Sequence, residues 1–201
     1  MIYKKYGKRI FDVIASAFGL ILLSPVFLGI AIIIKLTSKG PVFYIQERMG
    51  ENFKEFNLYK FRSMVVDADK KGLQITSGDD PRITKIGKFI RKTKLDELPQ
   101  LINVLKGDMS LVGPRPEVKK YVMLKKEDYE KVLSVKPGIT DLAAIEFRDE
   151  EKILEKYNDK EKAYIEIILP KKIELYKKYI DNISFKNDIN CLLYTSPSPR
   201  D

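Results

Sequence analysis

The feature that most constrains this chain is an apolar segment near its N-terminus. Residues 13–34 carry no charged side chain, and these 22 residues are enough for a helix to cross the hydrocarbon core of a bilayer. Basic residues flank the segment on both sides, and the positive-inside rule places such flanks on one side of a membrane. Pro25 breaks the helix midway, and the Ser24 hydroxyl can satisfy a backbone group that the break frees. We therefore predict a re-entrant membrane helix, broken at Ser24-Pro25, that leaves by the face it entered.

Two alternatives for this segment stay open. The first is an ordinary transmembrane anchor with a kink at the proline. The second is an uncleaved signal peptide, which the length of the apolar run and the lack of a clear small-residue cleavage site disfavour.

The composition limits the chemistry that the chain can perform. Its 201 residues include 37 Lys and Arg against 28 Asp and Glu, a net charge of +9 that favours nucleic acid, anionic lipid or phosphorylated small molecules as partners. There is no histidine, so any reaction must use carboxylates, lysines, hydroxyls or hard metal ions. The single cysteine, Cys191, excludes a disulfide within the chain and a cysteine-based zinc site. Nucleic-acid binding is disfavoured because the charges do not interleave with aromatic residues on a recognition element.

The remaining sequence predicts an α+β fold that is mostly helical. The expected elements are strands at 42–45 and 53–61 that form a small β-hairpin, a polar loop at 67–81, a mostly helical stretch over 86–105, an irregular segment at 109–116, charged amphipathic helices over 117–135 and 149–180, and a break between them at 136–140.

Two adjacent carboxylates, Asp96 and Glu97, follow a cationic run that includes Arg91. Neighbouring helix positions point about a quarter-turn apart, so one carboxylate could attack phosphorus while the other holds a divalent cation. Pro99 suits the first turn of a helix, and a helix beginning near Asp96 would direct its N-terminal amides at an anion. The local pattern also fits an acidic pair that only caps a helix.

Arg115 lies between two prolines, which fix φ on either side of it. A guanidinium presented so rigidly suits a phosphate or a carboxylate. A surface turn with a solvated arginine is the alternative.

Five segments in a fixed order resemble the bacterial sugar transferase family, the small monotopic phosphoglycosyl transferases. They are YKFRSM at 59–64, LDELPQL at 95–101, NVLKGDMS at 103–110, VGPRP at 112–116 and KPGIT at 136–140. The likeness runs from about residue 8 to about residue 189, which is nearly the whole chain.

The resemblance implies that the chain moves a sugar phosphate from a UDP-sugar to undecaprenyl phosphate and releases UMP, as the first membrane step of surface glycan biosynthesis. It implies that Asp96 is the nucleophile, through a covalent aspartyl-phosphosugar intermediate, and that Glu97 binds Mg²⁺. It also implies the bacterial inner membrane, with the catalytic domain on the cytoplasmic face and membrane lipids as partners. The substrate-binding residues implied or matched by the motifs are Lys60, Arg62, Arg91, Arg115 and Arg148.

One stretch departs from the family pattern. Many members continue after the Pro-Gly-Ile-Thr motif with Gly, an aromatic residue and Gln, whereas residues 141–148 read DLAAIEFR. Arg148 stands as the later arginine of the family, and the different lead-in suggests another donor sugar or a subgroup. The sequence does not name the sugar.

We divide the chain into the re-entrant helix at residues 1–39, the cytosolic catalytic domain at 40–190 and a tail at 191–201. The tail switches abruptly to Ser and Pro and resembles a translated sequencing adapter, so we expect it to be non-native; a native disordered tail is the alternative. The start at Met1 favours the short form of the family.

The rival function is a membrane-anchored basic scaffold without catalysis. A multispan lipid-linked enzyme is disfavoured by the lack of a second long apolar run.

Overall fold

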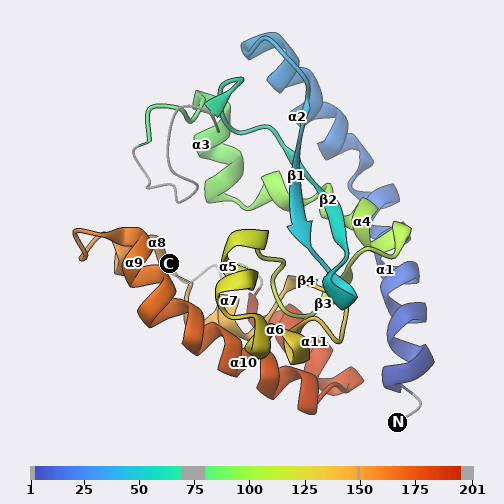
Figure 1. Ribbon diagram of the computed structural model, residues 1–201. Coiled ribbons are helices and arrows are strands. Elements are labelled where there is room, and N and C mark those ends of the chain that lie inside the picture. The colour runs from blue at the N-terminus through green and yellow to red at the C-terminus, as the bar shows by residue number, and fades with distance from the viewer. Residues whose placement is uncertain (1–2, 69–79, 149, 196–201) are drawn as a thin grey trace.

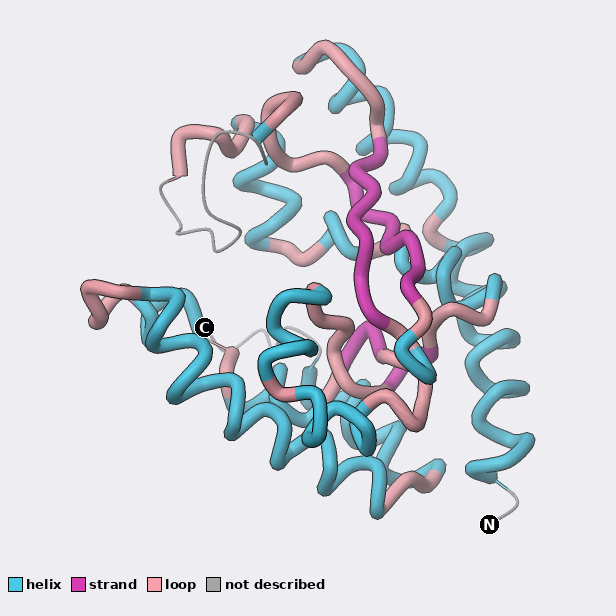
Figure 2. The backbone as a smooth tube through the Cα atoms, viewed as in Figure 1, coloured by secondary structure: helices cyan, strands magenta, loops and turns pink. Residues whose placement is uncertain are grey.

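The computed structural model describes residues 3–68, 80–148 and 150–195 (Figure 1). Most of the loop predicted at 67–81, and positions 196–201 of the predicted tail, lie outside these residues. The helices are α1 (Lys8–Leu22), α2 (Ser24–Thr37), α3 (Lys85–Lys92), α4 (Gln100–Lys106), α5 (Lys119–Leu124), α6 (Lys126–Val132), α7 (Leu142–Glu146), α8 (Glu150–Leu154), α9 (Lys160–Ala163), α10 (Leu169–Asp181) and α11 (Phe185–Thr195). The strands are β1 (Phe43–Met49), β2 (Glu55–Phe61), β3 (Ser110–Val112) and β4 (Gly138–Thr140). The predicted fold class, mostly helical with a small hairpin, is confirmed in these elements (Figure 2).

The apolar N-terminal segment is bent by 60° where α1 gives way to α2 at Leu23. Pro25 has no amide hydrogen to donate to the carbonyl of Ile21, four residues earlier. The Ser24 hydroxyl donates to that carbonyl instead, at 2.8 Å. Within the described residues no single helix has the length and apolar character to cross a bilayer, but the bent pair meets both criteria when taken together.

The predicted β-hairpin is present. Strands β1 and β2 pair antiparallel, with Phe43 opposite Phe61 and Met49 opposite Glu55. A short 3-10 turn, Glu51–Phe53, joins them. The hairpin contacts α4 and the turn that carries the two adjacent carboxylates, so it forms one wall beside them.

A second pair of strands was not predicted. Strand β3 falls where we expected an irregular segment and β4 where we expected a break, and they pair in parallel with Ser110 opposite Gly138. Each strand is only three residues long and lies at a glycine and a proline, a pair that locally indicates a turn. The pairing requires glycine, because a Cβ on Gly138 would lie 2.1 Å from the backbone nitrogen of Gly113.

The prediction that residues 86–105 are mostly helical is confirmed, and the structure adds that two helices share this stretch. Helix α3 ends at Lys92, and Lys94 adopts a left-handed conformation with φ of 55°. A single 3-10 turn, Leu95–Glu97, follows, and α4 begins only at Gln100 after Pro99. The adjacent carboxylates therefore lie on a short turn between two helices rather than at the start of a long one.

Helix α1 is hydrogen-bonded both to the end of α4 and to β3. The Arg9 guanidinium donates to the carbonyls of Val104 and Leu105 at the end of α4, at 2.6 and 2.9 Å. The buried Asp12 carboxylate accepts the amide of Leu111 in β3 at 3.0 Å. The broken helix therefore fixes the position of α4 relative to β3.

Candidate active site

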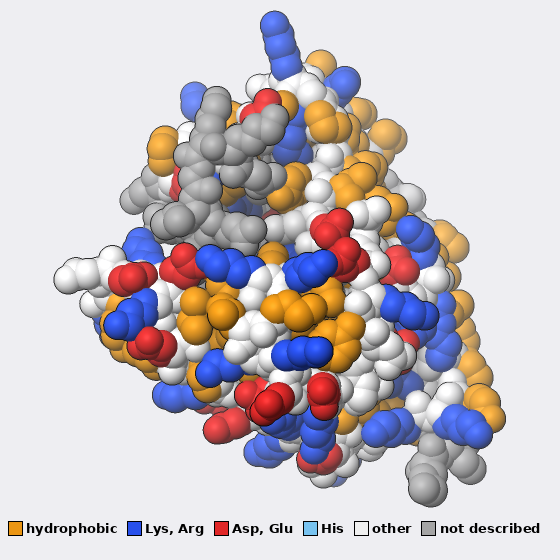
Figure 3. Space-filling view, in the orientation of Figure 1, with side chains coloured by type: hydrophobic (Ala, Val, Ile, Leu, Met, Phe, Trp, Pro, Cys, Tyr) orange, Lys and Arg blue, Asp and Glu red, His pale blue; other side chains and the backbone are white. Residues whose placement is uncertain are grey.

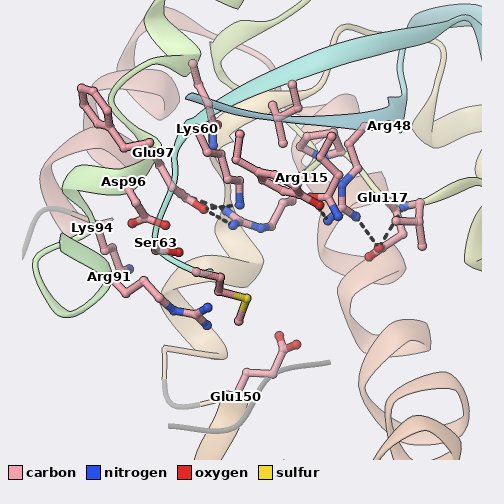
Figure 4. A pocket seen from close by; sticks show the side chains of 18 of the residues that line it. Arg48, Lys60, Ser63, Arg91, Lys94, Asp96, Glu97, Arg115, Glu117 and Glu150 are labelled. Carbon is pink, nitrogen blue, oxygen red and sulfur yellow. Dashed lines mark hydrogen bonds and ion pairs between the residues drawn. The ribbon is translucent and has the colours of Figure 1, made fainter. Parts of the chain in front are cut away.

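A cavity of about 950 Å³ opens between β2, the α3–α4 connection, the turn after β3, and helices α7 and α10. Asp96, Glu97, Arg91, Lys60 and Arg115 all line it, although they come from four separate parts of the sequence (Figure 4). The structure therefore brings together five of the residues predicted to act on substrate, and the other two, Arg62 and Arg148, line the same cavity.

Glu97 is held by two cations. Lys60 donates from β2 to Oε1 at 3.2 Å, and Arg115 donates to both carboxylate oxygens, with its Nη1 3.4 Å from Oε2. Although burial alone would raise the pKa of Glu97, the charges of Arg115 and Lys60 hold that pKa well below its usual range. Glu97 is therefore an anion at any physiological pH.

Asp96 differs from its neighbour. Within the described part of the chain its carboxylate accepts no hydrogen bond from another side chain or from the backbone. Burial first, and then the negative charge of Glu97, raise its pKa to about 6, against the opposing effect of Lys60, Arg91 and Arg115. At neutral pH Asp96 is thus mostly ionised and faces cations without being bound to one, which suits a nucleophile.

Arg115 extends from the turn that follows β3, and Figure 4 shows it directed at Glu97. Next to it lies an ion pair that the sequence analysis missed, between Arg48 of β1 and Glu117, at 3.1 Å. The Tyr164 hydroxyl donates to the other oxygen of Glu117. The strand alternation places Arg48 inward, and Glu117 follows the Pro-Arg-Pro turn directly, so both signals were present in the sequence.

Arg62 has a different environment from the other predicted residues. Its side chain is buried, and its two terminal nitrogens donate to the carbonyls of Lys39 and Ser38 at 2.7 and 2.9 Å. It thereby ties β2 to the end of α2. Arg148 is exposed at the rim of the cavity, beyond α7.

The donor set fits a magnesium ion that is shared with substrate. The described residues contain no group of three or more potential protein ligands, so protein side chains alone do not form a cage. Mg²⁺ commonly takes one or two carboxylates and completes its shell with water and phosphate oxygens. Asp96 and Glu97 provide hard oxygen donors in a cavity whose cations would attract a diphosphate.

Comparison with known proteins gives a consistent result over most of the chain. The family model described as bacterial sugar transferase matches residues 3–198. An uncharacterized sugar transferase of Bacillus subtilis, EpsL, is 42% identical over 188 residues, which cover 94% of this chain and 84% of that protein.

Two longer relatives have names that state a reaction. The UDP-glucose:undecaprenyl-phosphate glucose-1-phosphate transferase of Klebsiella pneumoniae is 44% identical over 197 residues, 94% of this chain. The UDP-N-acetylgalactosamine-undecaprenyl-phosphate N-acetylgalactosaminephosphotransferase of Aeromonas hydrophila is 42% identical over 145 residues, 69% of this chain. The matches span only 39% and 33% of these two relatives.

Proposed function

Because the chain belongs to the bacterial sugar transferase family, we propose that it transfers a sugar 1-phosphate from a UDP-sugar to undecaprenyl phosphate and releases UMP. The observation that carries this proposal is the contrast between two adjacent carboxylates. Glu97 is bound by Lys60 and Arg115, whereas Asp96 faces the same cavity without a hydrogen bond from the described residues. A covalent mechanism needs one carboxylate that is not bound to a cation, and Asp96 meets that need.

In the first step an oxygen of Asp96 attacks the phosphorus that bears the sugar. The bond from that phosphorus to the bridging oxygen of the diphosphate breaks, UMP leaves, and an acyl phosphate joins Asp96 to the phosphosugar. In the second step an oxygen of undecaprenyl phosphate attacks the same phosphorus, and the Asp96 carboxylate is regenerated. Both nucleophiles are already anions, so neither step needs a general base, which agrees with a chain that lacks histidine.

The cations of the cavity have a role in both steps. Arg91, Lys60 and Arg115 would face the diphosphate and stabilise charge on the leaving UMP. Glu97 would hold Mg²⁺ against the phosphate oxygens, and the ion would supply further neutralisation of the diphosphate. Glu97 also keeps Lys60 and Arg115 in place before substrate arrives.

The N-terminal helices support a site at a membrane surface. Apolar side chains of α1 point away from the protein, including Ile14, Phe18 and Ile21, which are 64%, 65% and 75% exposed. Figure 3 shows apolar side chains along the edge formed by α1 and α2. Together with the 60° bend, this surface suits a re-entrant helix in the inner membrane that delivers the lipid phosphate to a cytoplasmic catalytic domain.

The test is a UMP-release assay on the full chain in detergent micelles, with Mg²⁺, undecaprenyl phosphate and a panel of UDP-sugars. We expect release with at least one donor, and we expect Asp96→Asn to abolish both release and the phosphosugar adduct detected by intact-protein mass spectrometry. Glu55→Gln, which changes an exposed carboxylate on β2 outside the cavity, should leave both unchanged. Normal turnover by Asp96→Asn would exclude the mechanism. A wild type that releases no UMP from any UDP-sugar would favour the scaffold.

A further inference from the structure

Glu117 is a carboxylate of the cavity wall that the proposed mechanism does not use. It follows Arg115 after one intervening proline, and its side chain is 15% exposed. Its Oε1 accepts the Arg48 guanidinium at 3.1 Å and the amide of Val118 at 3.0 Å. Its Oε2 accepts the hydroxyl of Tyr164. Both oxygens of Glu117 are therefore bound by donors of the protein itself.

The backbone of Glu117 is held by the same strand as its side chain. Its carbonyl accepts the amide of Met49 at 3.0 Å, and Met49 follows Arg48 in β1. The Arg48 guanidinium is fixed in turn by a second hydrogen bond, to the side-chain oxygen of Gln46 at 2.8 Å. Tyr164 is buried and begins the π-helical turn that leads into α10. Glu117 therefore ties the turn after β3 both to β1 and to the start of α10.

The other end of the Pro-Arg-Pro turn is also held. The carbonyl of Pro114 accepts the amide of Gly138 at 2.9 Å, beside the pairing of β3 with β4. Arg115 thus lies between two backbone contacts, Pro114 with Gly138 and Glu117 with Met49. Prolines on either side of Arg115 fix φ there, which leaves the turn few free torsions. The position of the Arg115 backbone therefore depends on both contacts, and Glu117 provides one of them.

The surroundings of Glu117 disfavour a direct contact with the diphosphate. A phosphate group is an anion with acceptor oxygens, so a carboxylate repels it. Arg115, by contrast, is exposed to the cavity and reaches Glu97. Figure 4 shows Arg115 between the pair of adjacent carboxylates on one side and Arg48 with Glu117 on the other. A misplacement of about 1 Å in a group that acts on substrate can lower a rate about 100-fold, so the support of Arg115 matters to the reaction.

We infer that Glu117 is a positioning residue, which holds the Pro-Arg-Pro turn so that the Arg115 guanidinium reaches Glu97 and the diphosphate. The inference rests on the proposed function, because it takes the diphosphate of a UDP-sugar as the ligand of Arg115. An arginine side chain is long and loses rotamer freedom in any fixed contact, so its backbone must be placed accurately if the guanidinium is to bind. Arg48 and Tyr164 take part through Glu117, because each donates to one of its oxygens.

Two substitutions weaken this support with little change of shape. Glu117→Gln keeps the size of the side chain and removes its charge, and Tyr164→Phe removes only the hydroxyl that donates to Oε2. The matched control is Glu161→Gln. Glu161 also accepts a lysine ammonium and a tyrosine hydroxyl, from Lys120 and Tyr121, but it does not line the cavity.

The experiment is a double-mutant cycle with Arg115→Ala. Calorimetry measures the dissociation constant of UDP for the full chain in detergent micelles with Mg²⁺, and Tm is recorded for each variant. We expect Arg115→Ala to weaken UDP binding by about 10- to 100-fold, and Glu117→Gln to weaken it by about 3- to 10-fold. In the Arg115→Ala background, Glu117→Gln should change the affinity by less than about twofold, because the residue that it positions is gone. Tyr164→Phe should follow Glu117→Gln with a smaller effect, and the control should bind as wild type does.

A direct contact of Glu117 with UDP, or a general loosening of the fold, would weaken binding equally in both backgrounds and would overturn the inference. So would a UDP affinity that either Glu117→Gln or Arg115→Ala leaves unchanged. If Glu117→Gln fails to fold, the same cycle with Tyr164→Phe decides in the same way. UMP release by the wild type would keep the proposed function intact in each of these cases. A wild type that binds no UDP and releases no UMP would overturn both.

Discussion

Replacing Asp96 with asparagine should make the folded protein more stable at neutral and alkaline pH while it abolishes turnover. Burial and the charge of Glu97 raise the pKa of Asp96 from its ordinary value of 3.8 to about 6. The folded state therefore holds the proton more tightly than the unfolded state does, and this contribution to stability is lost as the pH rises from 3.8 through about 6. Asparagine is nearly the same size and does not ionise, so the variant avoids this loss.

The size of the effect follows from the two pKa values. At about 1.4 kcal/mol for each pKa unit, the difference between 3.8 and about 6 sets a ceiling of about 3 kcal/mol at pH 8. Solvent at the mouth of the cavity screens part of this, so we expect a gain of about 1 to 3 kcal/mol. For a chain of 201 residues each kcal/mol corresponds to a rise in Tm of roughly 2 to 4 °C. The gain should fall to about half at pH 5, because the folded carboxyl is then largely protonated.

The assay is thermal unfolding in detergent micelles at pH 8 and pH 5, without nucleotide or added metal. Glu55→Gln is the control, because the pKa of Glu55 is shifted in the opposite direction: its exposed partner Lys119 lowers it. This variant should therefore not gain stability at pH 8. A Tm for Asp96→Asn that is equal to or below wild type at pH 8 would refute the reasoning. So would a gain of the same size at both pH values.

Further predictions follow from the same contacts. The acid limb of kcat/KM against pH should have a midpoint near pH 6, since Asp96 must be ionised to attack, and a flat profile down to pH 5 would contradict this. Glu97→Gln should lower kcat by about 100-fold or more while the fold persists, measured by UMP release beside circular dichroism, because its two cations lose their anion. Gly138→Ala should destabilise the protein by about 3 kcal/mol or more in denaturant unfolding, because its Cβ would lie 2.1 Å from the backbone nitrogen of Gly113. Arg9→Ala should lower Tm and kcat together, because α4 would lose two hydrogen bonds from α1, and a change in neither would show that this contact is dispensable.

The features that the sequence predicted well depend on local chemistry. The break at Ser24-Pro25 needs only a missing amide hydrogen and a nearby hydroxyl, and the hairpin needs only two alternating runs around Gly50. The pairing of β3 with β4 joins segments more than twenty residues apart, and each segment reads locally as a turn. No periodicity in such short strands reveals that Gly113 and Gly138 meet.

The candidate site divides in the same way. The sequence places Asp96 beside Glu97 but does not distinguish them, and only resemblance to a family assigned one to attack and the other to metal. The structure distinguishes them because Lys60 and Arg115, from distant parts of the chain, both converge on Glu97.

That convergence has a chemical consequence for its neighbour. With its charge fixed by two cations, Glu97 stays ionised, and its negative charge is one of the causes that raise the pKa of Asp96. A raised pKa makes a carboxylate a better nucleophile, provided that the pH stays above it. The ion pairs of Glu97 therefore act on the reaction before any substrate binds. Arg115 therefore affects Asp96 through Glu97: it keeps Glu97 ionised, and the charge of Glu97 raises the pKa of Asp96. This effect is separate from any contact that Arg115 makes with the diphosphate.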